Sequence, residues 1–185
     1  ETEYVTLAQL LLLNQNPYQA AKVLEAGRAK KVLKINEETK EETLVVVVKD
    51  NEKNLRLLAD SWRMSQEIET AIPILEKAAK MSKDGKNYVL LGNLYLAEDN
   101  LELAIDSIKK GLEKGKVSKV SQVYLTLGQA YFELQMFNEA KKQFGKAARD
   151  KDKQVIATAN NWIRYTEREE ERVKNLELRR EFIKN

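Results

Sequence analysis

The stretch LGQAYFELQMFNEAKKQFGKA, residues 127–147, has small residues where a helix usually carries larger ones. With 3.6 residues per turn, one face of a first helix carries Tyr124, Leu127, Gly128 and Tyr131. One face of the next helix carries Ala140, Phe144 and Ala147. We predict that Gly128 and Ala140 are small because two antiparallel helices approach closely there, with the aromatic side chains filling the space around the contact.

The same skeleton occurs three more times along the chain. Thirty-six residues earlier it reads Tyr88, Leu91, Gly92, Tyr95, Ala104, Ile108 and Gly111. Before that it reads Leu55, Leu58, Ala59, Trp62, Ala71, Leu75 and Ala78. The first copy is Tyr4, Leu7, Ala8, Leu11, Ala20, Leu24 and Gly27. A single helix pair leaves its apolar face exposed, so we expect the four pairs to stack on one another.

This pattern resembles the tetratricopeptide repeat family, whose signature is aromatic-x₂-Leu-Gly-x₂-Tyr followed by Ala-x₃-Phe-x₂-Ala. The last copy departs from the signature only where Asp152 stands in place of the closing Pro, while Ala8 and Ala59 replace the Gly of the first two copies. The resemblance implies an all-α fold, a right-handed superhelical solenoid of antiparallel helix pairs with a long C-terminal capping helix. The predicted organisation is a repeat at 1–34, an insertion at 35–51, repeats at 52–84, 85–120 and 121–154, and a capping helix with a charged tail at 155–185.

The insertion, INEETKEETLVVVVKDN at residues 35–51, interrupts the period. Its β-branched run, residues 43–48, favours a strand, and residues 32–35 could pair with it as a hairpin. The alternative is an ordered loop or a continued helix whose valines cover the edge of the solenoid. An exposed strand of this type needs a cover, for which a second copy of the chain is one candidate.

The tail begins with an apolar stripe that should pack on the last repeat: Val155, Ala159, Trp162, Ile163 and Thr166. Beyond Tyr165 the chain is highly charged, with sparse apolar residues at Val173, Leu176, Phe182 and Ile183. A long solvated cap is one interpretation of this segment, and a partner-binding or coiled-coil extension is the other.

Composition excludes several classes of function. Lys and Arg number 32 and Asp and Glu 29, and the two signs are interspersed, so we expect no nucleic-acid partner. The chain has no Cys and no His, which removes disulfides, imidazole catalysis and ordinary zinc sites. We predict no enzyme activity, no catalytic residue, no metal and no cofactor. No stretch approaches the roughly 20 apolar residues of a membrane span.

The surface expected to bind a partner is the concave one, which the first helices of such repeats line. Beside the signature face, each first helix has residues at i, i+4 and i+7 that need not fill the core. These are Val5, Gln9 and Leu12; Arg56, Asp60 and Arg63; Val89, Asn93 and Leu96; and Leu125, Gln129 and Phe132. They predict a groove with apolar pockets, amides for a peptide backbone and one charged step.

Two alternatives bear on this groove. Val89, Leu96, Leu125 and Phe132 could instead pack one repeat against the next. Some members of the family bind a C-terminal carboxylate through a Lys and an Asn on one first helix. The matching pair here is Arg56 and Asp60, whose carboxylate would repel such a ligand.

A second, weaker resemblance concerns the segments LLADSW, AIPILEKAAKMSKDG, LEKG and WIRY. They look like the C-terminal part of bacterial periplasmic repeat proteins that accompany TonB/ExbB-type energy-transduction systems. The chain begins at Glu1 without a Met, which indicates a processed protein or a fragment. The predicted function is therefore a scaffold for a protein or peptide partner, located in the periplasm or alternatively the cytoplasm. The alternative function is a self-association module, a homo-oligomer joined through the Val-rich insertion or the C-terminal helix.

Overall fold

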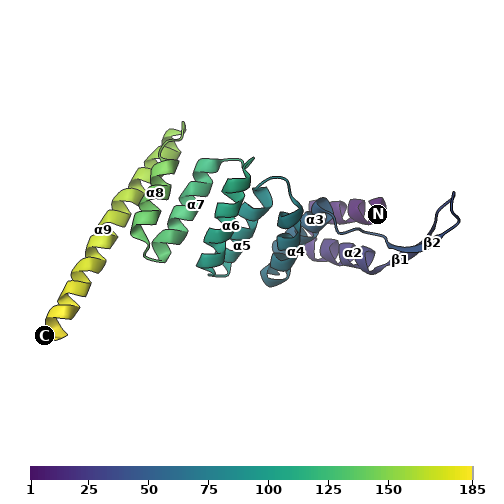
Figure 1. Ribbon diagram of the computed structural model, residues 1–185, viewed down its shortest axis with the longest axis horizontal. Coiled ribbons are helices and arrows are strands. Elements are labelled where there is room, and N and C mark those ends of the chain that lie inside the picture. Colours follow the sequence, from purple (N-terminus) through teal and green to yellow (C-terminus); the bar gives the residue numbers. More distant parts are fainter. Residues whose placement is uncertain (185) are drawn as a thin grey trace. The chain divides into compact units, whose positions relative to one another are not determined.

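The computed structural model describes residues 1–184, which form nine helices and one two-stranded sheet (Figure 1). The chain divides into two compact units, residues 1–83 and 84–185. In the first unit lie α1 (Thr2–Leu13), α2 (Pro17–Ala29), β1 (Lys31–Ile35), β2 (Glu42–Val46), α3 (Glu52–Met64) and α4 (Ile68–Met81). In the second lie α5 (Lys86–Ala97), α6 (Leu101–Lys114), α7 (Val120–Glu133), α8 (Phe137–Ala147) and α9 (Lys153–Lys184).

In each repeat, the turn between the first and the second helix contains a residue in the left-handed backbone conformation. These residues are Gln15, Gln66, Asp99 and Gln135, with φ between 55° and 67°. They recur at the same position of the four repeats and are followed by the N-cap of the second helix. A non-glycine residue in this conformation costs some free energy, so the helix packing on both sides must hold the turn.

The close approach of helices predicted at Gly128 and Ala140 is present in the second unit. Ala140 and Phe144 are fully buried, and Leu127 is 2% exposed. A Cβ atom added to Gly128 would lie 2.5 Å from Cε1 of Phe144, so only glycine fits against this ring without a shift of the neighbours. Phe144 in turn stacks on Trp162 of α9, with ring centroids 5.4 Å apart.

The insertion is a β-hairpin rather than a loop or a continued helix. β1 and β2 are antiparallel, with Leu33 opposite Leu44 and Lys31 opposite Val46. The strand pairing starts at Lys31, earlier than the predicted start of the insertion at Ile35, because residues 31–34 pair with β2 instead of extending α2. One face of the hairpin carries Leu33, Ile35, Leu44 and Val46, which are 36–68% exposed.

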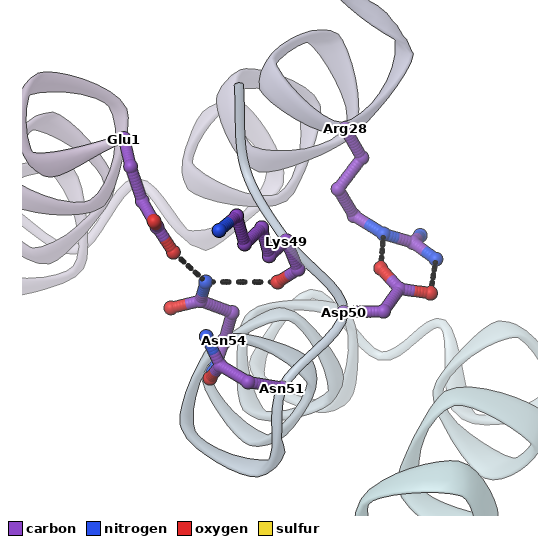
Figure 2. A network of polar contacts seen from close by, with 6 residues as sticks. All are labelled: Glu1, Arg28, Lys49, Asp50, Asn51 and Asn54. Atoms are coloured by element: carbon purple, nitrogen blue, oxygen red, sulfur yellow. Dashed lines mark hydrogen bonds and ion pairs between the residues drawn. The ribbon is translucent and has the colours of Figure 1, made fainter. Parts of the chain in front are cut away.

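Polar and apolar contacts fix the base of this hairpin, and Figure 2 shows the polar ones. Val48 is 1% exposed, and its side chain lies against Gly27 of α2. Asn54 of α3 donates to Oε1 of Glu1 at 2.7 Å and to the Lys49 carbonyl at 2.9 Å. The chain that leaves β2 is therefore tied to α1, α2 and α3.

An ion pair adds to this anchor. The Nε and Nη2 atoms of Arg28 donate to the two carboxylate oxygens of Asp50 at 2.6 and 2.8 Å, as Figure 2 shows. This bidentate contact lowers the pKa of the Asp50 carboxyl below its usual value and raises the pKa of Arg28. The hairpin as a whole is thus held at its base, while its tip extends away from the helices (Figure 1).

The helix α9 is continuous from the apolar stripe into the charged tail. Ala159 and Thr166 are fully buried, whereas Phe182 and Ile183 are 86% and 83% exposed. Lys141 of α8 pairs with Glu170 of α9 at 2.6 Å, close to the point where buried positions of α9 cease. Beyond it α9 runs on past α8 without a helix beside it within the second unit (Figure 1). No helix within residues 1–184 has the length and apolar character needed to cross a membrane.

Candidate partner-binding surface

In the first unit, the predicted residues of α1 lie on the surface. Val5 and Leu12 are half-buried and Gln9, between them along the helix, is exposed. The exposed part of the surface here is therefore mixed, with an amide that can bond a peptide backbone.

The predicted charged step of α3 is a compact ionic group. Oδ2 of Asp60 accepts from Nε of Arg56 at 2.7 Å, and Oδ1 lies 3.4 Å from Nε of Arg63. All three side chains are partly exposed, at 36%, 24% and 39% for Arg56, Asp60 and Arg63. One carboxylate between two guanidinium groups leaves this group with a net positive charge.

In the second unit, the predicted residues of α5 and α7 occupy equivalent positions of two repeats. Asn93 is exposed and Gln129 is half-buried. The apolar members are half-buried and pack on the hydrophobic core of this unit: Val89, Leu96, Leu125 and Phe132. Part of each side chain packs on the core, as the alternative from the sequence expects, and another part stays at the surface.

Phe132 differs from the other predicted residues because α9 lies against it. Its ring makes an edge contact with Trp162 at 5.7 Å and a tilted contact with Tyr165 at 5.3 Å. Phe137 of α8 contacts it from another side at 5.8 Å. The surface of α7 thus does not stay open at Phe132 but continues into an aromatic cluster formed with α9.

This continuation was not among the residues predicted from the sequence. Thr158, Asn161, Trp162 and Tyr165 line an open hollow of about 390 Å³ on one face of α9. Tyr165 is 48% exposed there. The spacing i, i+3, i+4 and i+7 of these residues was the available signal, since it places them on a single helical face. The apolar stripe of α9 predicts packing on the last repeat, but it does not indicate which of its aromatic side chains stay exposed.

The described residues contain no group of three or more His, Cys, Asp or Glu side chains that could hold a metal ion. Nothing in the geometry of α1, α3, α5 and α7 brings a nucleophile and a base together at the twelve predicted positions. What these positions offer is contact area, amide groups and one ionic group.

The comparison with protein families agrees with the repeat pattern. A tetratricopeptide repeat family model matches residues 85–113 and 121–149, which correspond to α5–α6 and α7–α8. A search of curated proteins found no match to the chain.

Solved structures of tetratricopeptide repeat proteins share the fold. The crystal structure of MamA protein matches with a TM-score of 0.67 at 16% identity, over 89% of this chain and 79% of that one. The C-terminal part of a TPR repeat-containing protein from Cytophaga hutchinsonii matches with 0.65 at 18% identity, over 88% of this chain and 57% of that one. The first TPR of Spaghetti (RPAP3), bound to the HSP90 peptide SRMEEVD, matches with 0.53 at 16% identity, over 63% and 90%.

Residues 85–113 and 121–149 therefore form two tetratricopeptide repeats, and the fold of the chain is similar to that of all-α tetratricopeptide repeat solenoids, with a long C-terminal helix. Both predictions from the sequence are confirmed. At this level of identity the likeness defines the fold and leaves the partner to be argued from the surface of the chain.

Proposed function

We propose that this chain is a non-enzymatic protein–protein interaction scaffold that binds a peptide segment of a partner on its first helices. The observation that carries the proposal is the repeated arrangement on α5 and α7. There, half-buried apolar side chains flank the amides of Asn93 and Gln129 at equivalent positions of two repeats. A backbone in extended or helical form can bond such amides while its side chains cover the apolar positions.

The aromatic cluster is the strongest candidate for the anchor of this contact. Trp162 and Tyr165 meet edge to face, with ring centroids 5.8 Å apart, and the Tyr165 ring remains half exposed. Residues that contribute most to binding are usually aromatic or Arg side chains at the centre of a packed contact. An apolar side chain of the partner would cover Tyr165 and lie in the open hollow beside it.

The ionic group on α3 restricts the choice of partner. In the RPAP3 structure a tetratricopeptide repeat domain binds an acidic peptide, SRMEEVD. In this chain the Asp60 carboxylate pairs with the Nε atoms of both Arg56 and Arg63. It also stands where a carboxylate-binding repeat would need a hydrogen-bond donor for the carboxylate of its ligand. We infer that α3 does not clamp a C-terminal carboxylate and that the partner binds through an internal segment.

For the cellular role we propose an accessory protein of a bacterial envelope assembly of the TonB type, located in the periplasm. Support for this comes from the resemblance of the segments at residues 57–62, 71–85 and 162–165 to periplasmic accessory proteins. Fractionation of the source cells tests the location, because a cytoplasmic fraction holding the protein contradicts it.

The binding proposal is tested with peptides selected from a random library on the immobilised chain, with affinity measured by fluorescence anisotropy. Tyr165→Ala is expected to weaken binding by roughly tenfold or more, as loss of an aromatic anchor does. Asn93→Lys, at an exposed amide, is expected to weaken binding without changing the melting temperature.

Tyr18→Ala is the matched control. Tyr18 is also 48% exposed and also makes an edge contact with a tryptophan, Trp62, at 5.7 Å, but it lies on the second helix α2. Its replacement is expected to leave peptide binding unchanged. Equal affinity of the wild type and the Tyr165→Ala variant, or an equal loss in the Tyr18→Ala variant, would refute the proposal.

A further inference from the structure

The outward face of α1 carries exposed leucines at helical spacing. Glu3, Leu7 and Leu10 follow one another at i, i+4 and i+7 and lie on one face of the helix. Leu7 is 48% and Leu10 is 50% exposed. The repeat pattern assigns Leu7 to the core, so its exposure is unusual, and Leu10 lies beside it on the same face.

The equivalent positions of the other repeats are buried. In α3 they are Leu58 and Ser61, both 0% exposed, and in α7 they are Leu127 and Ala130, at 2% and 1%. Within each unit these helices have a neighbour from the preceding repeat, since α2 packs against α3 and α6 packs against α7. The exposed face of α1 therefore has the composition of a surface that a helix covers elsewhere in the same chain.

The distal part of α9 has the complementary properties. Val173, Leu176, Arg180 and Ile183 follow one another with steps of three, four and three residues, as in the seam of a helix pair. Leu176 is 39% and Ile183 is 83% exposed. In the second unit no helix lies beside this part of α9 (Figure 1).

The charges of the two helices are opposite. α1 carries the acidic Glu3 and no basic side chain. In the segment 173–183 of α9, the basic residues Lys174, Arg179 and Arg180 outnumber Glu177 and Glu181. An antiparallel arrangement with Leu176 over Leu7 also brings Val173 over Leu10 and Arg180 opposite Glu3, because both stripes have the same spacing.

We propose that the distal part of α9 of one molecule packs antiparallel on the outward face of α1 of a second molecule of this chain. The contact joins two different surfaces, so it is head-to-tail: each molecule offers one α1 face and one α9 segment. Such an interface builds rings or open chains, depending on the angle between successive molecules. It is separate from the peptide-binding surface of the first helices, and its test does not involve a peptide.

Two variants of the full chain test the proposal by analytical ultracentrifugation. One carries Leu7→Gln and Leu10→Gln, the other Leu176→Gln and Ile183→Gln; all four side chains are substantially exposed, so both variants are expected to fold. The wild type is expected to form concentration-dependent oligomers. Each variant alone is expected to associate at least roughly tenfold more weakly than the wild type. An equimolar mixture of the two variants is expected to form a one-to-one dimer, because one supplies an intact α1 face and the other an intact α9.

Further variants control for other modes of association. Leu178→Gln removes an exposed leucine from the opposite side of α9 and is expected to leave the oligomers unchanged. Glu3→Lys is expected to weaken association, and Glu3→Lys combined with Arg180→Glu is expected to restore it. The proposal would be overturned by a monomeric wild type or by a mixture of the two double variants that stays monomeric. It would also be overturned if the oligomers were lost only with Leu44→Gln in the hairpin.

Discussion

The two glycines Gly128 and Gly145 give the sharpest test of the helix packing, because one chemical change should have opposite effects at the two sites. Both lie inside helices, in α7 and α8. A glycine in a helix interior costs about 0.5–1 kcal/mol relative to alanine. At Gly145 an added Cβ atom would have nothing within 4 Å, so Gly145→Ala is expected to stabilise the chain by about that amount.

At Gly128 the same gain is opposed by a steric conflict. The added Cβ would lie 2.5 Å from Cε1 and 2.6 Å from Cδ1 of Phe144. The ring is fully buried and stacked on Trp162 at an interplanar angle of 16°, so it has little room to move away. Overpacking of a filled core costs about 1–3 kcal/mol, and Gly128→Ala is therefore expected to destabilise the chain by up to about 2 kcal/mol.

Urea unfolding monitored by circular dichroism measures the change in the free energy of unfolding for both variants. A third measurement locates the conflict: in a Phe144→Leu background the ring is gone, and Gly128→Ala should cost less than in the wild type. If Gly128→Ala and Gly145→Ala stabilised the chain equally, the close approach of α7 and α8 at Gly128 would not be the reason for the glycine.

Two further predictions concern stability. Phe144→Ala removes a fully buried ring and should lower the free energy of unfolding by about 3–5 kcal/mol in the same urea assay; a loss below that of an exposed Tyr18→Ala variant would contradict the packing argument. Asp50→Asn should cost about 0.5–1 kcal/mol at neutral pH, because the pair with Arg28 is partly exposed. The pKa of Asp50 is lowered in the folded chain, so this contribution is present above the pKa of the unfolded carboxyl and is lost as the pH falls through the folded pKa. Urea titrations of wild type and Asp50→Asn should therefore converge in acid, and a difference that grows in acid would show that the pair is not responsible.

Much of the helical framework could be predicted from the sequence because it depends on local patterns. The spacing of Leu127, Gly128 and Phe144 defines which faces meet, and the small residue marks where the helices come closest. The same periodicity separates the candidate residues of α5 and α7 from the buried signature face, and in the structure Asn93 is exposed while the apolar candidates are half-buried. These features repeat in each helix pair, so a single chain contains several independent copies of the signal.

The features that only the tertiary structure decided depend on contacts between distant segments. From the sequence, the insertion could be a hairpin, a loop or a helix, because a strand forms only when it pairs with another strand. The base of the hairpin is held by a contact between Asn54 and Glu1, which lie far apart along the chain. Likewise, no pattern on α7 alone indicated that Trp162 and Tyr165 of α9 would lie against Phe132. Periodicity determined the helices and most of the faces that they bury, whereas the side-chain contacts between helices determined which parts of the surface remain exposed.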